Sequence, residues 1–235
     1  MKKSSFVAAL ALATTAVLPS LAYADVAFNA GVVTDYRYRG ISQSRLKPAV
    51  QGGVDYTQGA FYLGAWASTI KWVKDGGGAA DLEIDLYGGY KFELAKDLTL
   101  DLGVLGYIYP GHKLATSPNT TELYGAVTFG PATLKYSHST TNLFGFTSSK
   151  SSGYLDLNAT FDVAGFSLTP HIGRQTVKNN GAYAYTDLAL TVSKDVGNGV
   201  ILSATLVDTD TGNYLSPAGK DLGKTSLVLG AKINF

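Results

Sequence analysis

The sequence predicts an all-β protein, an antiparallel transmembrane β-barrel of about twelve strands. Three observations predict this fold class. The last nine residues carry apolar side chains at every odd position from Leu227 and end on Phe235, which is typical of the closing strand of an outer-membrane barrel. The same period-two alternation recurs in segments about as long as a tilted strand needs to cross a bilayer. Tight turns and longer loops alternate between these segments.

The composition agrees with a single domain. Of 235 residues, 46% are hydrophobic and only 16% are charged, with 27 Gly and 15 Tyr, so little of the chain is suited to a solvated helix surface. The absence of Cys excludes disulfides, thiolate metal sites and thiol nucleophiles.

Residues 1–24 are expected to be a cleaved secretory signal peptide, with the barrel formed by residues 25–235. Lys2 and Lys3 form a basic start, residues 6–18 an apolar run, and residues 22–24 a small-x-small cleavage site. A single helical anchor is the alternative, but the run is shorter than the roughly 20 residues that a span needs. Without Lys2 and Lys3 the 19 Lys and Arg become 17, against 18 Asp and Glu, and this near-neutral balance gives no reason to expect nucleic acid as a partner.

The alternation and the turn residues, taken in order, give the candidate strands. In the first half these are roughly 26–38, 48–57, 60–71, 81–94, 98–109 and 120–130; in the second half they are roughly 132–140, 153–163, 165–177, 183–195, 199–208 and 224–235. The tight links fall at 57–59, 130–131, 164–165 and 197–199, and the longer ones at 40–47, 76–80, 111–119, 141–152 and 209–223.

An even strand count places both termini on the periplasmic side and lets the strand that starts at Val26 pair with the one that ends at Phe235. Closure is required, because unpaired strand edges in hydrocarbon cost several kcal/mol for each unsatisfied group. A soluble sandwich is the alternative, but its inner face would be a packed apolar core. In strand 81–94, ionisable residues such as Glu83 and Asp85 alternate with apolar ones, and such a face needs a hydrated lumen.

Aromatic side chains cluster at the strand ends and predict two membrane-interface girdles. The periplasmic girdle would contain Phe28, Tyr56, Phe61, Phe92, Phe129, Phe161, Phe166 and Phe235. The outer girdle would contain Tyr36, Tyr38, Trp72, Tyr107, Tyr109, Tyr136, Tyr154, Tyr183 and Tyr185. Glycines within strands, among them Gly64, Gly89 and Gly103, are interpreted as sites of barrel curvature, with widening of the lumen as the second reading.

Several segments of the first half resemble a known family. These are 35–44 (DYRYRGISQS), 47–56 (KPAVQGGVDY), 61–68 (FYLGAWAS), 86–90 (LYGGY) and 107–111 (YIYPG). They are similar to the TorF family of porins, Gcw_chp-type outer-membrane proteins of proteobacteria. The match is specific from Gly31 to Gly111 and rests mainly on pattern beyond it. It implies an outer-membrane barrel that passes small solutes, with no defined substrate and no residue roles.

The alternation also predicts which ionisable residues line the lumen. They are Asp35, Arg37, Asp55, Glu83, Asp85, Lys91, Glu93, Asp101, Glu122, Lys135, Asp156, Asp162, His171, Asp187 and Lys232. Charges at membrane depth are costly unless they line water or pair. One interpretation is a porin-like channel for passive diffusion of small hydrophilic solutes or ions. The other is that the charges pair and stabilise a narrow, non-conducting structural barrel.

An outer-membrane lipid-modifying enzyme is a further alternative. Its only local support is His138 between Ser137 and Ser139, with no acidic residue near in sequence. The common hydrolase, phosphate-binding and dinucleotide motifs are missing, and three scattered His give no metal spacing. We therefore expect no catalytic site, no cofactor and no metal.

The expected partners follow from location and assembly. Basic residues in the longer loops, such as Arg45, Lys47 and Lys150, are suited to the phosphates of lipopolysaccharide among the outer-membrane lipids, or to steering anionic solutes inward. The resemblance to other outer-membrane proteins at Phe235 implies the barrel-assembly machinery and periplasmic chaperones as partners. Small solutes are also expected as partners.

Overall fold

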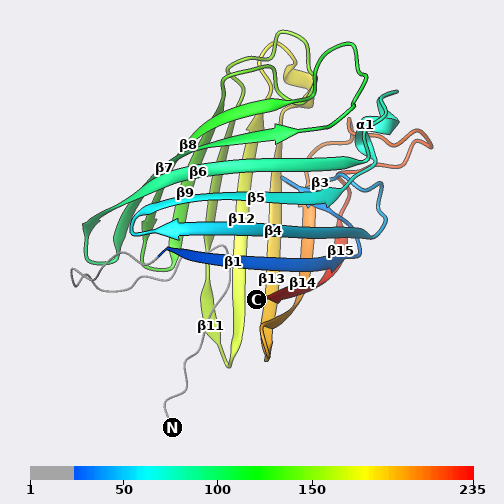
Figure 1. Ribbon diagram of the computed structural model, residues 1–235. Coiled ribbons are helices and arrows are strands. Elements are labelled where there is room, and N and C mark those ends of the chain that lie inside the picture. The colour runs from blue at the N-terminus through cyan, green and yellow to red at the C-terminus, as the bar shows by residue number, and fades with distance from the viewer. Residues whose placement is uncertain (1–23) are drawn as a thin grey trace.

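The computed structural model describes residues 24–235 and consists mainly of one closed antiparallel β-barrel (Figure 1). The predicted signal peptide, residues 1–24, lies outside the described residues apart from Ala24. The first half of the wall is formed by β1 (Asp25–Val33), β4 (Ala49–Gln58), β5 (Phe61–Thr69), β6 (Leu82–Ala95), β7 (Leu98–Ile108) and β8 (Thr120–Phe129). The second half is formed by β9 (Ala132–Ser139), β10 (Gly153–Ala159), β11 (Phe161–Val163), β12 (Phe166–Thr176), β13 (Tyr185–Gly197), β14 (Val200–Thr209) and β15 (Ser226–Asn234).

The barrel has twelve strand positions, as the alternation predicts, because β10 and β11 follow one another along a single position and both pair with β12. The pairing of β10 with β12 and that of β1 with β15 complete the ring, so no edge is left open. At the second seam Phe28 and Phe235 exchange two backbone hydrogen bonds and stack with ring centroids 6.1 Å apart. The predicted pairing of the first and last strands is therefore present.

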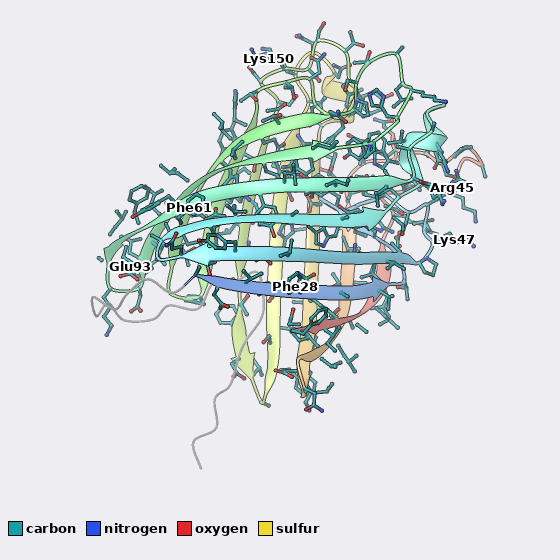
Figure 2. All side chains as sticks on the ribbon, in the orientation of Figure 1. Phe28, Arg45, Lys47, Phe61, Glu93 and Lys150 are labelled. Atoms are coloured by element: carbon teal, nitrogen blue, oxygen red, sulfur yellow. The ribbon has the colours of Figure 1, made fainter. Side chains whose placement is uncertain are left out.

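Tight turns lie at one end of the barrel and longer connections at the other, because each strand runs antiparallel to the next. We call these the turn end and the loop end. β1 starts and β15 finishes at the turn end, and α1 (Trp72–Asp75) and η1 (Gly181–Tyr183) lie in loop-end connections. In Figure 2, Phe61 and Glu93 mark the turn end, and Arg45 and Lys47 the loop end. Within residues 24–235, no helix is long and apolar enough to cross a membrane.

The outer surface of the barrel is apolar along the strands. Side chains that alternate with the lumen-facing ones are exposed, including Leu86, Leu123, Leu188 and Leu206, each about half accessible. A surface of this kind suits hydrocarbon, not water. The predicted girdle at the turn end is also visible, since Phe28, Phe61, Phe129 and Phe235 are among the exposed aromatic residues there.

The predicted girdle at the loop end is wrong for most of its members. Tyr36, Tyr107, Tyr109, Tyr154 and Tyr185 are each less than 8% exposed and lie inside the barrel. Tyr136 is the member that faces outward, at 49% exposed. The reason is that the other rings pack around a segment of chain inside the barrel, so they gain more from burial there than from the membrane interface.

Strand glycines make room for tyrosine rings of neighbouring strands. A Cβ atom at Gly64 would lie 2.5 Å from Cζ of Tyr87, and one at Gly89 would lie 2.6 Å from the carbonyl oxygen of Leu102 and against the Tyr62 hydroxyl. These glycines do not widen the lumen, because tyrosine rings cover them. The interpretation that strand glycines widen the lumen is therefore wrong for Gly64 and Gly89.

Gly64→Ala should therefore destabilise the barrel by about 1–3 kcal/mol, the usual cost of overpacking. The measurement is the free energy of unfolding from urea titration in detergent micelles. Gly106→Ala is the matched control, because a Cβ there would have its nearest neighbour 3.9 Å away. Equal losses in the two variants would contradict the role assigned to the tyrosine ring.

Candidate functional site: the barrel lumen

Residues 34–48 leave the wall after β1 and fold into the lumen, and we call them the plug segment. The strand expected at 26–38 ends at Val33, and the following chain forms a small hairpin from β2 (Arg37–Tyr38) and β3 (Ile41–Ser42). Gly40, at the hairpin turn with φ +79°, lies so close to β13 and β14 of the wall that a Cβ would be 2.5 Å from Thr209 and 2.7 Å from Asp187. Any larger residue there would push the hairpin off the wall.

Arg39 at the hairpin tip links the plug segment to two strands of the wall, β8 and β12. Its two terminal nitrogens donate to the carboxylate of Glu122 on β8 at 3.0 and 2.7 Å, and one also donates to Gln175 on β12 at 2.8 Å. The guanidinium lies over the ring of Tyr154, 4.2 Å from its centroid. Although burial alone would lower the pKa of Arg39, Glu122 raises it well above its ordinary value, so the side chain stays charged.

A chain of polar contacts continues from Tyr154 along the wall. Its hydroxyl donates to the carboxylate of Asp187, at 2.9 and 3.1 Å. His171 lies between Asp187, 2.8 Å from Nε2, and Asp156, 2.9 Å from Nδ1. Both ring nitrogens face carboxylate oxygens, an arrangement that only the doubly protonated imidazolium satisfies.

The base of the plug segment is fixed by a second group of contacts. Asp35 binds Arg37 at 2.5 Å and accepts a hydrogen bond from Ser44 at 3.1 Å. Tyr36 donates to Glu83 on β6 at 2.6 Å. Burial raises the pKa of the Tyr36 hydroxyl far above its ordinary value and Glu83 adds to this, so Tyr36 remains a neutral donor.

Burial of the lumen-facing residues changes along the barrel axis. Towards the loop end, Glu83, Asp85, Glu122 and Asp187 are each no more than 9% exposed, because the plug segment covers them. Towards the turn end, lumen-facing side chains such as Lys91 are only partly buried. The lumen is thus filled in its loop half and accessible in its turn half.

The partly accessible half has charged groups of both signs on the nearby strands β6, β7 and β9. Tyr62 donates to Asp101 at 2.6 Å, and Lys91 lies opposite Asp101 in the β6–β7 register. Lys135 lies 3.9 Å from the centroid of the Tyr124 ring. Both cations thus lie against aromatic faces, since Lys91 is also 5.4 Å from the centroid of the Tyr62 ring.

The structure places the residues predicted to line the lumen in three groups. On the lumen face of wall strands lie Asp55, Glu83, Asp85, Lys91, Asp101, Glu122, Lys135, Asp156, His171, Asp187 and Lys232. Asp35 and Arg37 belong to the plug segment. Glu93 and Asp162 are exposed at the turn end, beyond the lumen, as Figure 2 shows for Glu93.

The prediction missed Arg39, Gln175 and Tyr154. Arg39 falls between the strand expected at 26–38 and the loop expected at 40–47, and Gln175 is uncharged, so it is not among the ionisable residues assigned to the lumen. The single available signal was the Arg-x-Arg-Gly sequence at 37–40, in which glycine permits a tight turn between two long cationic side chains.

The suspected enzymatic residues are not assembled by the fold. Ser137 and Ser139 are buried on the lumen side of β9, and His138 lies on the opposite face of that strand. Ser139 donates instead to the carbonyl of Thr141 at 2.6 Å. Among residues 24–235, no group of three or more His, Asp and Glu side chains is placed to hold a metal ion.

Solved structures with the same fold are porins. A KdgM porin aligns with a TM-score of 0.58 at 7% identity over 91% of this chain and 99% of its own. A NanC porin aligns with a TM-score of 0.56 at 10% identity over 90% and 99%. At these identities the likeness concerns the fold alone.

Comparison of sequences gives the family. No curated protein matches the sequence. A family model described as "Bacterial protein of unknown function (Gcw_chp)" matches residues 20–235, which include the whole barrel. The chain therefore belongs to the Gcw_chp family of bacterial proteins.

Proposed function

We propose that the protein is an outer-membrane channel for passive diffusion of small hydrophilic solutes or ions, closed at its loop half by the plug segment. The observation that carries this proposal is the change in burial along the lumen. A polar, charged and partly accessible half-lumen leads directly to a segment that is held to the wall by side-chain contacts and not by strand pairing. Such a segment can leave without breaking the barrel, because it contributes no strand to the ring.

Several observations support the outer membrane as its location, with both termini in the periplasm. The ring is closed, the outside is apolar and the turns are short at the end that carries the termini. The segments that resemble TorF porins include the plug segment itself, at 35–44 and at the beginning of 47–56, and this supports the same assignment.

A non-conducting structural barrel is the second candidate. The paired charges around Arg39 and His171 favour it, because they fill the loop half as a stable core would. The two candidates differ in whether the plug segment ever leaves.

Single-channel recording of the refolded mature protein in a planar bilayer under a salt gradient separates these candidates. We expect stepwise currents with long closed intervals. Because the chain has no Cys, Thr191→Cys on the lumen face of β13 can be modified with a charged thiosulfonate without background. Modification should reduce the current, and Leu190→Cys on the outer face is the control. A folded barrel that never conducts would favour the structural candidate.

A further inference from the structure

A cavity of about 280 Å³ lies at the loop end, against the plug segment. Tyr38, Ile41, Ser42 and Gln43 of the plug segment form one side. The other sides come from α1, from the loops that follow β7, β9 and β14, and from the loop ends of β12 and β13. Its volume is near the lower limit of about 300–1,000 Å³ that is usual for small-molecule sites.

The lining combines aromatic rings with neutral polar groups. Two ring pairs illustrate the aromatic part. Trp72 packs on Tyr109 with ring centroids 5.0 Å apart, and Tyr185 packs on Tyr214 with centroids 5.4 Å apart. Neutral amides come from Gln43, Gln175 and Asn213. Flat apolar faces and scattered amides together suit a ligand that has both C–H surfaces and hydroxyl groups.

Charge in the lining restricts the ligand further. Asp75 is the one charged side chain among the lining residues of the described chain, and it is paired with Arg45. Within residues 24–235, no lysine or arginine lines the cavity, so an anionic ligand would find no counter-charge among them.

Trp72 adds an independent observation. Its indole Nε1 is buried and has no hydrogen-bond acceptor among residues 24–235. Leaving a buried donor unpaired costs about 1–3 kcal/mol, which would be relieved when ligand binding turned the Trp72 ring so that Nε1 met an acceptor oxygen of the ligand.

We propose that this cavity binds a neutral saccharide of one or two sugar rings. Sugar rings have apolar C–H faces that pack on aromatic rings, and their hydroxyl and ring oxygens accept hydrogen bonds from an indole or an amide. Because one side of the cavity is the plug segment, the bound sugar contacts the element that closes the lumen. The step from a bound sugar to a transported sugar rests on the proposed function. Binding itself can be measured without conduction.

The two tryptophans of the chain make a direct test possible. Trp66 is not among the lining residues, so Trp66→Phe leaves Trp72 as the only tryptophan, which can be excited selectively over the tyrosines. Titration of this variant in detergent with galactose, glucose, maltose and lactose should give a saturable change with at least one of them. The matched variant Trp72→Phe, which keeps Trp66, should give none. Galacturonate and choline are the anionic and cationic probes, and each should bind at least tenfold more weakly than the best neutral sugar.

A variant pair locates the binding. Tyr214→Ala in the cavity should weaken the sugar at least tenfold, and Tyr56→Ala at the turn end should leave the affinity unchanged. Saturation with none of the four sugars, equal binding of choline or galacturonate, or equal loss in the two Ala variants would overturn the proposal. A barrel that binds sugar but never conducts would refute the channel alone, whereas conduction without sugar binding would refute the site alone.

Discussion

Arg39→Ala should raise the ratio of open to closed intervals by about 100-fold to 4,000-fold in single-channel records. In the closed state the variant leaves Glu122 buried, at 1% exposure, without its cation. Breaking a buried ion pair from one side costs about 3–5 kcal/mol, and 1.4 kcal/mol changes an equilibrium tenfold. When the plug segment leaves, Glu122 faces water, so the penalty falls on the closed state.

Two controls protect this interpretation. Arg174→Ala removes an exposed arginine that lies 3.8 Å from Asp210 at the surface, and its records should match those of the wild type. The double variant Arg39→Ala/Glu122→Gln removes both charges; it should fold as stably as the wild type and still open more often, because the hairpin has lost its strongest tether. Unchanged gating in both Arg39 variants would mean that the plug segment is held by other contacts or never moves.

Leu190→Arg should destabilise the folded barrel in phospholipid vesicles by about 2–4 kcal/mol, the cost of a cation facing lipid near the bilayer midplane. Leu190 lies near the middle of β13 and is 43% exposed on the outer surface. The measurement is the free energy of unfolding by urea titration in vesicles.

Thr191→Arg, one residue further along the same strand, is the matched control. Its side chain faces the lumen, where water and carboxylates solvate a guanidinium, so the expected loss is below about 1 kcal/mol. Similar losses in the two variants would contradict a lipid-facing outer surface.

The wall of the barrel was predictable because the alternation of side chains is a local property. Leu86 beside Asp85, or Leu188 beside Asp187, already assigns one face to hydrocarbon and the other to the lumen, and Phe235 identifies the closing strand. Glycine in the tight links marks the turns, as at Gly59 and Gly130, where φ is positive.

The contents of the lumen were not predictable in this way. Residues 34–38 alternate as a strand would, and only contacts with residues distant in sequence decide that they turn inward. Arg39 finds Glu122 and Gln175, which are 83 and 136 positions away along the chain. A one-dimensional pattern carries no information about which charges meet inside a closed ring.

The sequence by itself thus determined the strands, their two faces and the closure of the sheet, because each follows from residue type and spacing. The tertiary structure decided that residues 34–48 fill the loop half, that most loop-end tyrosines are buried and that an aromatic cavity forms beside them. The physical reason is that buried ion pairs and ring contacts depend on distances across the barrel, which are set only when the sheet has closed.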